Sequence, residues 1–142
     1  MHRIEESITI AAPLERVFAV IADIESYPSF LPTIKQAKIL RRGKGWCEAR
    51  FVIDLLQCLE YTVRMTLKPP RGLRWKLIEG EMMSHNDGEW KLTALSRGKT
   101  KATYRMEVKL TTWIPQSVVK ALIATGLVDM LDHFRDHAEA KP

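Results

Sequence analysis

The fold is decided by residues 59–80, LEYTVRMTLKPPRGLRWKLIEG. Apolar and polar side chains alternate on both sides of residues 69–72, Pro-Pro-Arg-Gly, and a period of two is typical of a half-buried strand. The connection is too short for a crossover helix and contains turn-forming residues. The stretch therefore predicts two antiparallel strands, 59–68 and 73–80, with one covered face and one solvated face.

The same alternation continues outward from this hairpin in both directions. Further strands are predicted at 35–42, 46–55, 88–96 and 101–112, with one more at 4–10. Turn residues lie at 42–45, 86–88 and 97–99. At 86–88 two interpretations fit, because Gly88 suits either a turn or a bulge at the start of a strand. Short connections throughout predict a seven-stranded antiparallel meander.

Helices are expected only at the two ends of this meander. Pro13 suits the first turn of a short helix, and the two prolines within 26–32 restrict a second helix to about one turn. From Pro115 onward, apolar residues follow the i, i+3, i+4, i+7 pattern of a long amphipathic helix. The fold class is therefore α+β, with a curled sheet around a long C-terminal helix and a single domain over residues 1–142.

Composition excludes several classes of protein. The chain has 142 residues, of which 46% are hydrophobic and 27% charged, with a formal net charge of +5. No apolar run approaches the length that spans a bilayer, and no secretory signal is present. Cys47 and Cys58 flank a predicted hairpin and are not expected to pair. His133 and His137 have metal-ligand spacing on one helix but no third ligand, so neither a metal nor a cofactor is predicted. We expect a cytoplasmic protein with reduced thiols.

The covered face of the predicted sheet is rich in methionine and in aromatic residues with polar tips. One long helix and two short ones provide too little material to fill the hollow of a strongly twisted sheet. The alternation thus predicts an apolar pocket for a small molecule, although each residue also fits an ordinary core. The candidate lining residues are Phe51, Ile53, Tyr61, Val63, Met65, Trp75, Leu77, Trp90, Tyr104, Met106, Leu122, Ile123, Leu127 and Met130.

One carboxylate is predicted on the inner face. The parity of Leu73, Trp75 and Leu77 extends to Glu79, which inside a cavity would have a raised pKa and act as an acid or base. The alternative is a strand-end carboxylate that lies in water or pairs with an arginine. A tyrosine of the inner face can orient a carbonyl or phenol of the ligand, or can be an ordinary core residue.

The outer face carries more basic than acidic residues. Interleaved charges usually form cross-strand pairs in solvent, but the excess of arginine and lysine also fits phosphate groups of RNA or anionic lipid. No aromatic residues are interleaved with them, so sequence-specific recognition of nucleic acid is not predicted. The basic residues are Arg50, Arg64, Arg74, Lys76, Lys91, Arg105 and Lys109, with a second group at Lys35, Lys38, Arg41, Arg42 and Lys44.

Several motifs resemble a known superfamily. Ala12-Pro13, the Tyr-Pro-Ser-Phe-Leu-Pro stretch at 27–32, Glu79-Gly80 and Gly88-Glu89-Trp90 are similar to those of the START and polyketide cyclase/dehydrase superfamily. Within it, the chain most resembles the coenzyme Q-binding and ribosome-association-toxin branch. The resemblance covers essentially the whole chain and implies the helix-grip fold.

Three functions follow as expectations. The first is binding of a hydrophobic small molecule, such as a polyketide-like compound, an isoprenoid quinone or a lipid, between the sheet and the C-terminal helix. The second is a cyclase, aromatase or dehydratase that uses the same cavity, with Glu79 moving protons. The third is an interaction protein that docks on the ribosome or on an anionic membrane through its basic surface.

Overall fold

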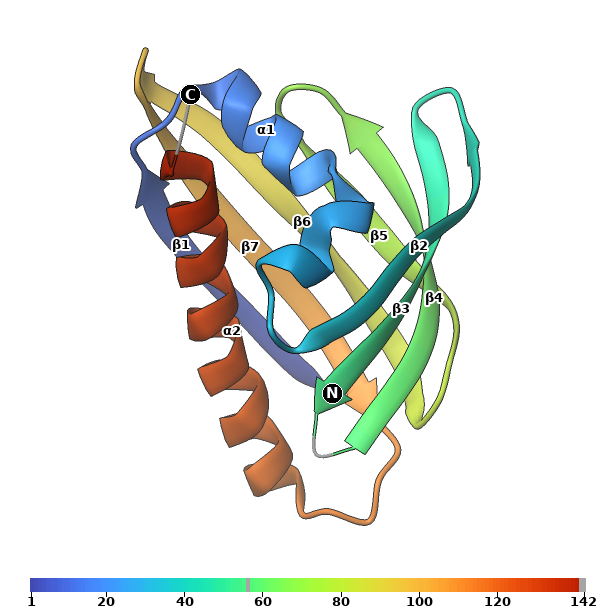
Figure 1. Ribbon diagram of the computed structural model, residues 1–142. Coiled ribbons are helices and arrows are strands. Elements are labelled where there is room, and N and C mark those ends of the chain that lie inside the picture. Colours follow the sequence, from blue (N-terminus) through green and yellow to red (C-terminus); the bar gives the residue numbers. More distant parts are fainter. Residues whose placement is uncertain (56, 141–142) are drawn as a thin grey trace.

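A curled antiparallel sheet holds a long helix against its concave face (Figure 1). The computed structural model describes residues 1–55 and 57–140, so residues 56, 141 and 142 of the expected domain lie outside the described part. The seven strands are ordered β1-β7-β6-β5-β4-β3-β2. They are β1 (His2–Ile10), β2 (Ile34–Gly43), β3 (Trp46–Leu55), β4 (Gln57–Lys68), β5 (Gly72–Gly80), β6 (Met83–Ser96) and β7 (Lys99–Leu110). The predicted α+β helix-grip fold is confirmed.

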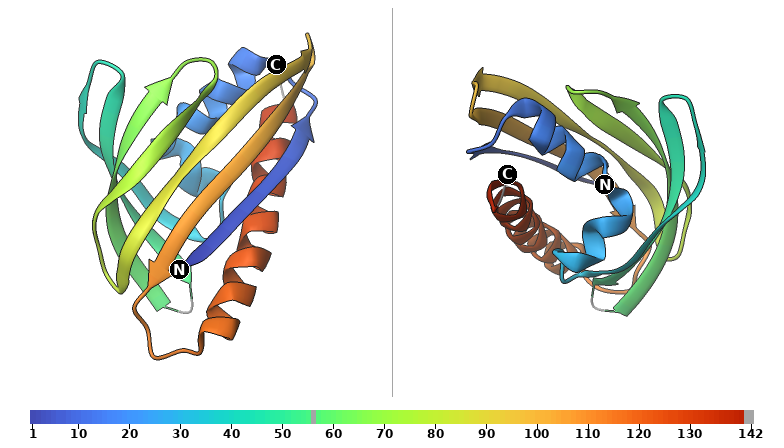
Figure 2. Two further views of the ribbon diagram at one scale, coloured as in Figure 1. Left: turned by 180° about the vertical axis from the view of Figure 1, so that it is seen from behind. Right: turned by 45° about the horizontal axis from the view of Figure 1, so that its top comes forward.

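The helices lie together on the concave side of the sheet (Figure 2). They are α1 (Leu14–Ala22), a short 3₁₀ helix η1 (Ile24–Ser29), and α2 (Gln116–Glu139). Pro13 and Pro115 immediately precede α1 and α2, where a missing backbone N–H costs nothing. None of the helices in the described part of the chain is long and apolar enough to cross a bilayer.

Tyr27 of η1 is a centre of the packing between helices and sheet. Its ring lies 5.3 Å from that of Phe134 on α2 and 6.1 Å from those of Phe30 and Phe51. These edge-on and offset contacts are the favourable arrangements of aromatic rings. The proline-rich stretch that limits η1 to a short helix therefore also carries an anchor that joins α2 to the sheet.

Strand β6 begins earlier than predicted. It starts at Met83, and Asn86 pairs with Val108 of β7 inside the ladder, so the turn predicted at 86–88 is wrong. The chain reverses instead around Met82, whose φ of 55° is left-handed. Gly88 is an ordinary ladder position opposite Met106, and the irregularities in pairing fall between Met83 and His85 and between Ala94 and Ser96.

The ladder between β5 and β6 is incomplete. In the described chain these strands pair only where Gly72–Trp75 meets Gly88–Lys91. Beyond that point a side chain bridges the two strands, because the backbone N–H of Leu77 donates to Asp87 Oδ1 at 3.4 Å. We call this region the β5–β6 seam. It leaves the middle of the sheet less tightly closed than the β6–β7 ladder, which pairs along nearly its whole length.

Candidate ligand-binding site

A cavity of about 80 Å³ lies between the sheet, η1 and α2. Most of the residues predicted to line a pocket do so here: Phe51, Tyr61, Val63, Met65, Trp75, Trp90, Tyr104, Met106 and Met130. The remaining lining residues, which the sequence did not single out, are Tyr27, Leu31, Ile34, Asn86 and Phe134. We call this space the inner cavity. The expectation that the helices leave the hollow of the sheet partly unfilled is met, although the space is small.

The other predicted residues lie elsewhere in the core. Ile53 and Leu77 are half-buried and contact both hydrophobic clusters, whereas Ile123 and Leu127 are buried on α2. Leu122 lines a second, more open pocket. Ile53, Leu77, Ile123 and Leu127 are therefore ordinary core residues, and Leu122 lies outside the inner cavity.

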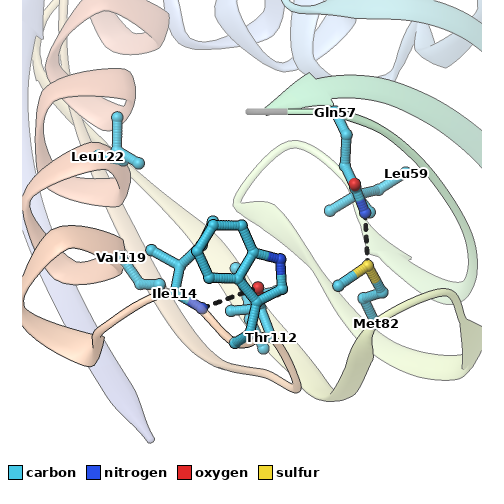
Figure 3. A pocket seen from close by; sticks show the side chains of 9 residues that line it. Gln57, Leu59, Met82, Thr112, Ile114, Val119 and Leu122 are labelled. Atoms are coloured by element: carbon cyan, nitrogen blue, oxygen red, sulfur yellow. Dashed lines mark hydrogen bonds between the residues drawn. The ribbon is translucent and has the colours of Figure 1, made fainter.

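The second pocket has a volume of about 270 Å³ and lies where α2 begins (Figure 3). We call it the mouth pocket. Its wall comes from β4, the end of β7, the β5–β6 turn and the first turns of α2. The lining residues are Gln57, Leu59, Met82, Leu110, Thr112, Trp113, Ile114, Val119 and Leu122. Only Leu122 among them was predicted from the sequence.

Two contacts shape the rim of the mouth pocket. The side-chain amide of Gln57 reaches the sulfur of Met82, and the backbone N–H of Ile114 bonds Thr112 Oγ1 at 3.3 Å (Figure 3). Trp113 is 89% exposed, which is unusual for so large an apolar side chain. One signal in the sequence could have indicated this pocket, an aromatic residue directly before the Ile114-Pro115 helix start.

A hydrophobic partition lies between the core around the inner cavity and the cluster beneath the mouth pocket. The half-buried side chains of Tyr61, Met106 and Leu77 pack against both the main core cluster and the smaller cluster beneath the mouth pocket. Tyr61 and Met106 also line the inner cavity. Methionine side chains rotate at low cost, so a partition of this kind can yield to a guest.

The polar side chains of the inner cavity are tyrosine, tryptophan and asparagine groups, all of them neutral. Tyr104 Oη lies 3.5 Å from the sulfur of Met106, a weak acceptor, and Asn86 Oδ1 accepts a 3.0 Å bond from Trp75 Nε1. Burial raises the pKa of Tyr61 and of Tyr104 far above the ordinary value of 10.0. Both phenols therefore stay protonated and can donate to an acceptor on a ligand.

Tyr27 has a different role from the other two tyrosines. Its hydroxyl donates to the backbone carbonyl of Ile21 at the end of α1. Burial also raises the pKa of this phenol. Electrostatic repulsion from Tyr104 and Tyr61 in their ionised forms makes a smaller contribution in the same direction. Its donor is already used, so only Tyr61 and Tyr104 offer phenolic hydrogen bonds to a guest.

The expectation that Glu79 faces the inside of the sheet is wrong. Thr62 pairs with Glu79 but Val63 pairs with Leu77, so Ile78 is an extra residue on β5. A bulge of this kind reverses the alternation beyond it. Glu79 is exposed as a result, which agrees with the alternative of a strand-end carboxylate in water, and its carboxylate lies outside the inner cavity.

Titratable groups are scarce at the inner cavity. Among its described lining residues, only tyrosines carry an ionisable side chain. Across residues 1–55 and 57–140, no cluster of three or more histidine, cysteine, aspartate or glutamate side chains could hold a metal ion. His137 instead stacks on Phe30 with the ring centres 4.0 Å apart. The arrangement favours holding an apolar molecule.

Many ion pairs lie on the outer face of the sheet, which agrees with the interpretation of its interleaved charges as cross-strand pairs in solvent. These pairs include Arg3–Glu107, Arg41–Glu48, Arg50–Glu60 and Arg74–Glu89, with N–O distances of 2.7, 2.8, 3.3 and 3.9 Å, and also Arg105–Glu89. Glu48 and Glu89 each lie within ion-pair distance of two arginines. The pairing is thus incomplete, and the outer face keeps a positive excess.

This fold and lining agree with a family match over nearly the whole chain. Residues 10–135 match the family described as polyketide cyclase/dehydrase and lipid transport. The chain belongs to this family. The resemblance inferred from the motifs is thereby confirmed, including its START-like character and its similarity to coenzyme Q-binding proteins and ribosome association toxins.

Curated relatives of this cyclase/dehydrase and lipid transport family member are distant. It is 24% identical over 78 residues to the mitochondrial coenzyme Q-binding protein COQ10 of Drosophila melanogaster, covering 54% of this chain and 32% of that protein. It is 23% identical over 112 residues to the ribosome association toxin RatA of Escherichia coli K12, covering 78% and 70%. The chain therefore spans about a third of the fruit-fly relative.

Solved structures support the same fold. A START superfamily protein from Mycobacterium smegmatis superposes with a TM-score of 0.89 at 19% identity, covering 99% of both chains. The Zhui aromatase/cyclase from Streptomyces sp. R1128 superposes with a TM-score of 0.87 at 23% identity, covering 97% of this chain and 93% of that one. At these identities the likeness establishes architecture only.

Proposed function

We propose that the protein binds a hydrophobic small molecule that carries a hydrogen-bond acceptor, such as a quinone, a polyketide-like compound or a lipid carbonyl. The observation that carries the proposal is the lining of the inner cavity, which is apolar except for neutral tyrosine, tryptophan and asparagine groups, two of them phenols free to donate to a guest. The ligand enters through the mouth pocket and places its acceptor near Tyr61 and Tyr104. The family match supports a hydrophobic ligand but does not specify which one.

The size of the two pockets limits the binding mode. A cavity of about 80 Å³ is smaller than the usual ligand pocket of about 300–1,000 Å³, whereas the mouth pocket of about 270 Å³ approaches that range. The ligand body therefore occupies the mouth pocket, and its polar end displaces the flexible side chain of Met106 to reach the inner cavity.

The same lining supports binding over proton-transfer catalysis. General acid–base chemistry near neutral pH needs a group whose pKa lies near the working pH. Tyr61 and Tyr104 have strongly raised pKa values, and Glu79 is outside. A cyclase or dehydratase using this cavity would have to rely on positioning and hydrogen bonding.

Two matched ligands test the role of the phenols. Menadione and 2-methylnaphthalene share a fused-ring skeleton, but only menadione has carbonyl acceptors. Replacing both Tyr61 and Tyr104 by phenylalanine should weaken menadione binding about threefold to tenfold per lost hydrogen bond. The affinity for 2-methylnaphthalene should stay unchanged. Equal effects on both ligands in a titration calorimeter would show that the phenols do not bind the carbonyls.

A second experiment tests the route of entry. Leu122→Trp places a bulky ring in the mouth pocket, whereas Val128→Trp adds the same ring at a position on α2 that is already 51% exposed. We expect Leu122→Trp to weaken menadione binding at least tenfold and Val128→Trp to leave it unchanged. Unaltered binding by a folded Leu122→Trp protein would exclude the mouth pocket.

A further inference from the structure

The outer face of the sheet has a hollow of about 420 Å³ above the β5–β6 seam. We call it the outer hollow. Gly88 is one of its lining residues, and a Cβ there would lie 2.3 Å from Cζ2 of Trp75 and 2.5 Å from the carbonyl oxygen of Arg105, so the indole packs directly on the backbone of β6. The hollow is lined by Arg64, Thr66, Arg74, Trp75, Lys76, Asp87, Gly88, Arg105 and Glu107.

The outer hollow is distinct from the inner cavity but adjoins it. Trp75 lines both spaces, while its Nε1 donates to Asn86 Oδ1 on the inner side. The indole therefore separates an apolar compartment from a charged one. Nothing in the proposed binding of a hydrophobic ligand uses the charged side of this wall.

The charge of the outer hollow is positive even after its acids are counted. Four cations line it, against the carboxylates of Asp87 and Glu107. Glu107 also pairs with Arg3 at 2.7 Å, and Asp87 Oδ2 lies 3.5 Å from His85 Nε2. Both carboxylates are thus partly engaged by groups outside the lining.

The arginines of the outer hollow are undercompensated. Glu89 is shared by Arg74 and Arg105, so two guanidinium groups have one carboxylate between them. Glu48 bonds Arg41 at 2.8 Å and lies 3.9 Å from Arg64.

Two further features make the outer hollow ready for an anion. Arg64 is held over the ring of Trp46 at 4.3 Å, which fixes its guanidinium without neutralising it. Among the described residues no carboxylate lies within ion-pair distance of Lys76. The hollow therefore offers one unpaired ammonium group beside three guanidinium groups.

We propose that the outer hollow binds an organic phosphate. Guanidinium groups match the oxygens of phosphate in a bidentate geometry, and an ammonium group adds a point charge. A volume of about 420 Å³ leaves room for an organic group beside the phosphate. A soluble nucleotide and a phospholipid headgroup share this chemistry, and the binding experiment separates these two sources.

Titration calorimetry of the full chain at 0.1 M NaCl tests the proposal, with ADP and glycerophosphoinositol as the probes. We expect saturable binding of one probe, which identifies the source, and a shift of the Trp75 indole N–H resonance when that probe is added. Lys76→Gln should weaken the affinity at least fivefold. Lys101→Gln, a matched loss of an exposed lysine on the same face but outside the hollow, should change it less than twofold.

Three results would overturn the proposal. They are the absence of saturable binding of either probe at millimolar concentration, equal losses in the two lysine variants, and an unchanged Trp75 resonance at saturation. Lys76 and Lys101 are both exposed, so neither variant should alter the melting temperature. Because the probes are hydrophilic, failure here is independent of menadione binding.

Discussion

Replacing Val63 by isoleucine tests whether the inner cavity receives a ligand or is only a packing gap. Val63 is 1% exposed and lines this cavity of about 80 Å³. At about 24 cal/mol per Å³, an empty space of that size costs about 2 kcal/mol. One added methylene group gains about 0.8 kcal/mol by burial and fills part of the gap. The variant should therefore be stabilised by about 1 kcal/mol, a rise in melting temperature of about 3 °C.

The same variant should lose ligand. Calorimetric unfolding and menadione titration on one preparation should show higher stability together with at least a fivefold weaker affinity. Val17→Ile is the matched control, because Val17 is also 1% exposed but lines neither pocket. It should be destabilised by about 1–3 kcal/mol through overpacking, with an unchanged affinity. A destabilised Val63→Ile protein that binds menadione normally would refute the reasoning.

Three further predictions concern pH and backbone. Loss of water around the phenol groups raises the pKa of all three tyrosines, so their stabilising contribution is complete below pH 10 and is lost as the pH rises. Tyrosinate absorbance should therefore appear only together with unfolding. The hydrogen bond from Arg41 lowers the pKa of Glu48 below its ordinary value of 4.5, so this pair stabilises the fold above that pH and less so as the pH falls. In Arg41→Gln the free energy of unfolding, measured with urea, should therefore decrease less on acidification below pH 4.5 than in the unaltered protein. Gly72→Ala should unfold the protein or lower its melting temperature by more than 10 °C. The φ angle of Gly72 is 148°, and a Cβ there would lie 1.9 Å from the carbonyl oxygen of Trp90. An unchanged melting curve would contradict this geometry.

Much of the fold was predictable because its pairing is local. Each strand of the meander pairs with its neighbour in sequence except for β1, which closes onto β7. Alternation and turn residues are therefore enough to order the sheet. The apolar stripe after Pro115 likewise determines α2, whose buried residues recur along one face.

The errors arose where a bulge or a long-range contact decides the outcome. A single extra residue, Ile78, places Glu79 outside, and alternation alone carries no sign of it. The residue type of Asn86 predicts a turn, yet its side chain accepts a hydrogen bond from Trp75 across the β5–β6 seam. The mouth pocket was missed because it forms between segments far apart in the chain, such as Leu59 and Val119.

The position of Trp75 has a consequence for how this protein can change over generations. The Trp75 indole lines the apolar inner cavity on one side and the charged outer hollow on the other. A substitution of Trp75 therefore alters both spaces at once. A smaller side chain at position 75 would open a path between the two spaces, and any side chain at Gly88 would clash with the ring. A change in the specificity of either space must then come from substitutions at surrounding positions, while Trp75 and Gly88 are constrained together.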